Sequence, residues 1–95
     1  MTDRLVERMA KVLKAIAHPD RLKIIEILKD GEKCVNKIVE RLGGSQSSTS
    51  QHLNLMTDKG VLARKRDGMR VYYRIANKDV LKILRCLYRH CRQQE

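Results

Sequence analysis

The sequence has no tryptophan, no phenylalanine and a single proline among its 95 residues. Tyr72, Tyr73 and Tyr88 are its only aromatic residues, so the core has to be built from Leu, Ile, Val, Met and Ala. No apolar run approaches the roughly 18 residues that a membrane-spanning helix needs, and early charged residues interrupt any signal-peptide segment. These absences predict a single small domain over residues 1–95 with no membrane association.

Cysteine is also scarce. The sequence has three cysteines, an odd number, and no secretory signal is recognised in it. This usage predicts reduced thiols and a cytoplasmic location. The chain shows no nucleophile beside a base and no paired-carboxylate site, and Gly43-Gly44 lacks the lysine of a P-loop. We therefore expect a protein that is not an enzyme.

Acidic residues are few, 11 against 21 lysines and arginines, and the formal net charge is +10. The excess is uneven, because residues 1–58 carry a net +2 and residues 59–95 carry a net +8. A basic second half predicts a polyanionic partner, and nucleic acid is the partner that this pattern favours.

Apolar periodicity predicts five helices and one β-hairpin. The expected helices cover residues 4–17, 19–29, 35–42, 45–58 and 78–92, and the expected strands cover residues 61–66 and 69–75. Asp67-Gly68 is a two-residue hairpin signal in which both central positions favour positive φ. A helix, a short glycine turn at Gly43-Gly44 and a second helix outline a helix-turn-helix, so the predicted fold is mostly α with a small β wing.

The stretch SQSSTSQHL opens the fourth predicted helix, with Ser45 as its N-cap. On a helical wheel Thr49, Leu53 and Met56 share one side. Ser48 lies nearer that packed side. The opposite side is short, polar and uncharged, which suits a helix that enters the major groove and hydrogen-bonds to base edges and phosphates. The predicted DNA-contacting residues of this helix are Ser45, Gln46, Ser47, Ser50, Gln51 and Asn54.

The predicted hairpin is basic around its tip, with Arg64, Lys65, Arg66 and Arg70. A basic hairpin that follows a recognition helix is a wing, and we expect it to hold phosphates or the minor groove. The same charges could also protect an exposed strand edge from pairing with another chain.

The segments LKAIAHPDRLKIIEIL, EKCVNKIVERL and GGSQSSTSQHLNLMTDKGVLARKRDGMRVYYRI, with the last helix, resemble the ArsR/SmtB family of winged-helix repressors. The resemblance implies a homodimer that represses an operon from double-stranded DNA, at an imperfect inverted repeat, until an inducer binds. The apolar stripes of the first and last helices independently favour a two-fold partner. Gly44 departs from the family, which usually has an aliphatic residue there. The rival interpretation is an architectural or RNA-binding winged helix that has no sequence preference and no inducer.

The resemblance also implies places where an inducer could bind, such as zinc or another soft metal. In the family's cysteine box only Cys34 matches, because Asn36 replaces the second cysteine. In the pattern on the last helix His90 matches and Asp79 could ligate, whereas Asn77 and Gln93 are poor ligands. Asp79 and His90 are therefore the candidate metal ligands.

Thiol chemistry is the other option for an inducer. Cys34 opens a helix beside Lys33 and Lys37, and Cys91 lies among arginines, so these two cysteines are the candidate thiol sensors. Cys86 is expected to be packed and inert, although two Cys86–His90 pairs across a two-fold axis could also hold zinc.

Overall fold

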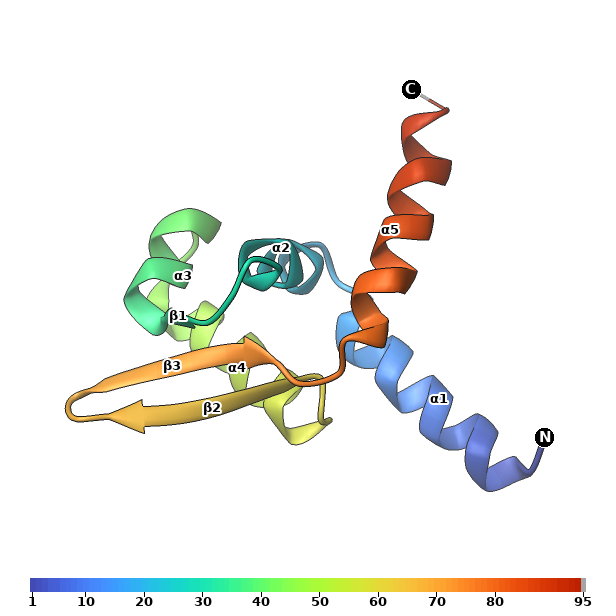
Figure 1. The fold of residues 1–95 in the computed structure, drawn as a ribbon, viewed down its shortest axis with the longest axis horizontal. Helices are drawn as coiled ribbons and strands as arrows, with labels where there is room; N and C mark the ends of the chain where they lie inside the picture. The colour runs from blue at the N-terminus through green and yellow to red at the C-terminus, as the bar shows by residue number, and fades with distance from the viewer. Residues whose placement is uncertain (95) are drawn as a thin grey trace.

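The computed structural model describes residues 1–94, which form five helices and a three-stranded antiparallel sheet (Figure 1). The helices are α1 (Asp3–Ile16), α2 (Pro19–Leu28), α3 (Val35–Leu42), α4 (Gln46–Asp58) and α5 (Asp79–Arg92). The strands are β1 (Lys33–Cys34), β2 (Leu62–Asp67) and β3 (Arg70–Ile75). The predicted elements are confirmed, with ends shifted by a residue or two, and the fold is a winged helix-turn-helix.

Strand β1 is the one element that the sequence did not predict. It pairs with β3, so that Lys33 lies opposite Tyr73 and Cys34 opposite Tyr72, and the strand order is β1-β3-β2. Two residues are too few to show an alternating pattern. Lys33 and Cys34 form a strand only because β3 of the wing provides the backbone groups with which they pair.

The hairpin turn also differs from the prediction. Asp67 pairs with Arg70, so the two loop residues are Gly68 and Met69 rather than Asp67 and Gly68. Gly68 has φ +63°, and no residue other than glycine has positive φ among those described. Glycine at the first central position is typical of a type II′ turn, which needs positive φ at that position only.

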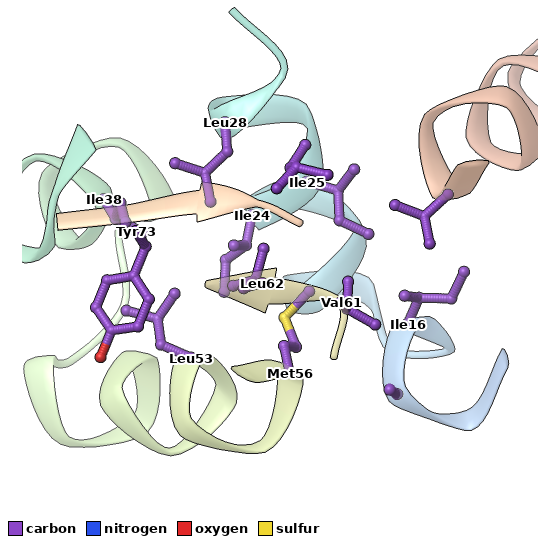
Figure 2. Close-up of a cluster of buried hydrophobic side chains, with 13 residues drawn as sticks. Ile16, Ile24, Ile25, Leu28, Ile38, Leu53, Met56, Val61, Leu62 and Tyr73 are labelled. Carbon is purple, nitrogen blue, oxygen red and sulfur yellow. The ribbon is translucent and has the colours of Figure 1, made fainter. Parts of the chain in front are cut away.

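The core lies between α2, α4 and the root of the wing (Figure 2). Ile24, Ile25 and Leu28 from α2 face Leu53 and Met56 from α4, and all five are buried. The nearly all-apolar α2 is thus the central helix, as its composition predicted. Val61, Leu62 and Tyr73 close the core from the wing side, which fixes the hairpin relative to α4.

Helices α1 and α5 lie together at one end of the molecule, and the tip of the wing lies at the opposite end (Figure 1). Only Ala15 and Ile16 of α1, and only Val80 of α5, are buried. None of the described helices is long and apolar enough to cross a membrane.

Candidate nucleic-acid interface and a histidine cluster

Helix α4 has one buried side and one exposed side, as the helical wheel predicted. Thr49, Leu53 and Met56 are buried against the core. Ser48 and Ser50 are half-buried. The exposed side carries short polar groups and no charge, and its residues are Gln46, Ser47, Gln51 and Asn54.

The first turn of α4 is fixed by its own short side chains. Ser45 is the N-cap, and its Oγ accepts a hydrogen bond from the Ser48 amide at 3.0 Å. The Thr49 hydroxyl donates to the Ser45 carbonyl at 2.8 Å, which satisfies a buried polar group inside the helix. The predicted role of Ser45 as N-cap of α4 is therefore confirmed, and its contact with DNA stays a prediction.

The wing carries its charges on both faces. Arg64 and Arg66 share a face with Tyr73 and point toward α4, whereas Lys65 and Arg70 lie on the other face. On that other face the Lys65 Nζ lies 3.8 Å from Oε1 of Glu32. The four basic residues predicted as one set are therefore divided into two pairs.

A groove separates α4 from the wing. It has a volume of about 410 Å³ and is lined by Val35, Gln46, Ser50, Arg64, Arg66, Val71 and Tyr73. Its cationic wall belongs to the wing and its polar wall to α4. The groove therefore combines guanidinium groups with short polar side chains, and both can hydrogen-bond to an anion.

One hydrogen bond joins the two walls of this groove. Arg64 donates from its guanidinium to Oδ1 of Asn54 at 3.1 Å, between exposed parts of both side chains. Both residues were predicted as separate DNA contacts. In the protein without DNA they contact each other, which aligns the wing with the C-terminal half of α4.

The N-terminal end of α2 and the inner edge of α4 meet in a cluster that the sequence did not reveal. The His18 and His52 ring centroids lie 4.6 Å apart, and Nε2 of His52 lies 3.8 Å from Oδ2 of Asp20. His18 caps α2, because its Nδ1 accepts a hydrogen bond from the Asp20 amide at 3.0 Å. The two histidines are far apart in the sequence, so no local pattern could join them.

Arg21 completes this cluster. Its Nε donates to Nδ1 of His52 at 3.1 Å, and its guanidinium also donates to the Lys14 carbonyl at 3.3 Å. Burial lowers the pKa of His52, His18 and Arg21 lower it further, and Asp20 opposes them. His52 is therefore neutral near pH 7, and one arginine connects α1, α2 and α4.

The candidate metal ligands on α5 are far from one another. Asp79 and His90 lie at opposite ends of α5, about 16 Å apart along its axis. Asp79 lies 3.6 Å from the Lys82 ammonium, and the His90 ring contacts the Gln94 amide at 3.2 Å. One protomer therefore does not bring these two predicted ligands together.

The cysteines are likewise dispersed. Cys34 is half-buried at the N-cap of α3, Cys91 is exposed, and the far end of α5 stands away from β1 (Figure 1). Cys86 is exposed, so the expectation that it is packed was wrong for the protomer. The reason is its position on α5, because Cys86 lies about 120° around the helix from Val80 and so on the polar side.

The chain is similar to known regulators over most of its length. A family model described as bacterial regulatory protein, arsR family, matches residues 18–63. The transcriptional repressor PagR of Bacillus anthracis is 43% identical over 83 residues, which cover 86% of this chain and 83% of PagR. An HTH-type transcriptional regulator of Mycobacterium tuberculosis is 35% identical over 79 residues, which cover 83% of this chain but only 35% of that longer protein.

Solved structures agree with the sequence comparison. HlyU from Vibrio cholerae superimposes with a TM-score of 0.83 at 30% identity, covering 93% of this chain and 96% of HlyU. A homodimeric winged helix-turn-helix DNA-binding domain from Mycobacterium bovis gives a TM-score of 0.84 at 31% identity, covering 99% of this chain and 90% of that one. The recognition helix, wing and histidine-capped α2 described above thus lie in a chain that belongs to the arsR family of bacterial regulatory proteins, and it is a winged helix-turn-helix transcriptional regulator.

Proposed function

We propose that the protein is a cytoplasmic homodimeric repressor that reads an imperfect inverted repeat in double-stranded DNA and leaves it when an inducer binds. The observation that carries this proposal is the exposed, uncharged polar side of α4, which lies beside a cationic wing across one groove. Short polar side chains allow a helix to approach base edges closely, and the wing supplies the charge.

In this proposal the predicted contacts fall into three groups. Gln46, Ser47 and Gln51 lie on the exposed side of the first two turns of α4, where recognition helices contact bases. Arg66 and Arg70 at the wing carry charge without a fixed partner among the described residues and are suited to phosphate. Asn54 and Arg64 act as a pair, because each holds the other in place before DNA binds.

The dimer is supported by the unpartnered apolar sides of α1 and α5 and by the homodimeric relative from Mycobacterium bovis. Two recognition helices in a two-fold dimer would contact half-sites about 34 Å apart, one turn of B-DNA. The inducer remains a metal ion or a thiol-reactive compound in this proposal. The resemblance to a probable mercury resistance operon repressor from Streptomyces lividans favours the metal.

The test compares binding to a palindromic promoter fragment with binding to scrambled DNA. Gln46→Ala, Ser47→Ala and Gln51→Ala should each reduce affinity by roughly 1–3 kcal/mol on the palindrome and by little on scrambled DNA. Arg66→Ala and Arg70→Ala should weaken binding to both DNAs and lower the salt slope by about one for each phosphate that the variant no longer binds. Equal reductions on both DNAs in the α4 variants would instead identify an architectural protein.

A further inference from the structure

Three metal-ligating side chains from two separate segments converge beside the recognition helix. His18 and Asp20 come from the start of α2, and His52 comes from the middle of α4. Each offers a ligand atom within 4.8 Å of the other two, and no other group of three His, Cys, Asp or Glu in residues 1–94 does so. All three are half-buried, and a hydrogen bond holds each of the two imidazole rings.

We propose that His18, Asp20 and His52 form a binding site for a divalent cation of the zinc class. Two imidazoles and one carboxylate, with water as the fourth ligand, are a donor set that zinc accepts in proteins. Tetrahedral zinc with bonds of about 2.0–2.1 Å places neighbouring ligand atoms about 3.4 Å apart. The 3.8 Å between His52 Nε2 and Asp20 Oδ2 has to shorten only slightly.

The present hydrogen bonds show what the cation has to displace. Because Arg21 donates to Nδ1 of His52, that nitrogen carries no proton, and the neutral ring keeps its proton on Nε2. The cation can bind Nε2 of His52 only after this proton moves to Nδ1. A protonated Nδ1 can no longer accept the hydrogen bond from Arg21. The ring stays neutral throughout, so the exchange neither consumes nor releases a proton.

His18 is subject to the same exclusion. Its Nδ1 accepts the Asp20 amide, so its ring also holds the proton on Nε2. To bind the cation the His18 ring has to lose this hydrogen bond. Either its proton moves from Nε2 to Nδ1 and Nε2 binds the cation, or Nδ1 binds the cation directly. Cation binding therefore excludes the hydrogen bonds that His18 and His52 accept in the structure. The site has two discrete arrangements, one with these hydrogen bonds and one with the cation.

Through this competition, cation binding can change how the recognition helix α4 is positioned. Arg21 connects His52 on α4 with the Lys14 carbonyl near the end of α1. A cation on His52 releases that connection and alters how α4 is held relative to α1. This regulatory consequence rests on the proposed DNA-binding function, whereas cation binding itself does not.

Cobalt(II) titration of the full-length protein without DNA tests the site. We expect visible d–d absorption of a nitrogen and oxygen set without a thiolate-to-cobalt charge-transfer band. Asp20→Asn, His52→Gln and His18→Asn should each weaken cobalt binding at least about tenfold, as removal of a direct ligand should exceed the effects known for outer-shell partners. Asparagine is a favoured N-cap, so His18→Asn removes the imidazole and keeps the cap.

The matched controls are Asp30→Asn and Asp58→Asn, which change exposed aspartates near the ends of α2 and α4 and should leave cobalt affinity unchanged. A thiolate band, weakened binding in these controls, or undiminished binding in Asp20→Asn would overturn the proposal. Absence of cobalt binding at millimolar concentration would overturn it as well.

A second measurement separates the site from its consequence. Zinc should weaken binding of the wild-type protein to its palindromic DNA by about tenfold, within the usual range of allosteric coupling, and should not affect Asp20→Asn. If zinc binds but operator affinity is unchanged in the wild type, the link through Arg21 is wrong. If metal-free protein does not prefer the palindrome at all, the proposed function fails while the cobalt result still decides the site.

Discussion

Helix α4 and the two terminal helices all carry a periodic apolar side, but the protomer covers only that of α4. Leu53 and Met56 are fully buried, whereas Leu5, Val6, Met9 and Leu13 of α1 are 43–49% exposed. On α5, Leu87 is 48% and Tyr88 is 63% exposed. The same pattern in sequence thus has two outcomes, and the uncovered stripes mark where a second copy is expected.

The largest effect should follow from a change in the covered region. Leu53→Ala removes a fully buried side chain between α2 and the wing and should lower the free energy of unfolding by about 3–5 kcal/mol. Denaturant titration at fixed chain concentration measures this decrease. Met69→Ala, at a fully exposed tip residue, is the control and should change stability by less than about 0.5 kcal/mol. A small effect of Leu53→Ala would mean that this core is not what holds α4.

The uncovered region should respond through assembly instead. Leu84→Glu combined with Leu87→Glu places charge on the stripe of α5 and should give folded monomers, since neither residue is fully buried in the protomer. Sedimentation should show the monomer, and operator affinity should fall about a hundredfold. Wild-type monomers at micromolar concentration that still bind the operator tightly would refute the dimer.

The cysteines test whether the two regions communicate. Cys34 lies at the edge of the helix-turn-helix and Cys91 on α5, so a disulfide between them would need a second copy or a large movement. Its formation would transfer two electrons and two protons from the thiols to the oxidant. Oxidant or persulfide should then weaken operator binding about tenfold in wild type and in Cys86→Ser.

Cys34→Ser and Cys91→Ser should each abolish that response. A double Cys34→Ser, Cys91→Ser variant that still responds would end the thiol hypothesis. It would leave metal binding as the remaining route to induction.

The sequence predicted the features that depend on local patterns. Helix α4, its Ser45 cap and its buried side followed from periodicity and cap chemistry, and the wing followed from alternation around Gly68. Strand β1, the Asn54–Arg64 bond and the His18–His52 contact were missed. Each joins residues distant in the chain or too few to form a pattern, so only the folded protein brings them together.

The smallest effect concerns the turn between α3 and α4, where two adjacent glycines have different constraints. Gly43 has φ +79° and ends α3 in the left-handed region. Gly44 is outside that region, and a Cβ there would meet only Thr49 Oγ1, at 3.8 Å. Gly44 therefore occupies its position without a conformational need for glycine.

Gly44→Ala should raise the free energy of unfolding by about 0.4–1 kcal/mol, because alanine reduces the entropy of the unfolded chain and fits the native conformation. Gly43→Ala should lower it by about 1–2 kcal/mol through left-handed strain. Thermal unfolding of the two variants side by side measures both signs, as shifts of about 4–8 °C for each kcal/mol in a domain of this size. If Gly44→Ala also destabilises, the turn requires flexibility at this position, and the departure from the family's aliphatic residue would be functional rather than incidental.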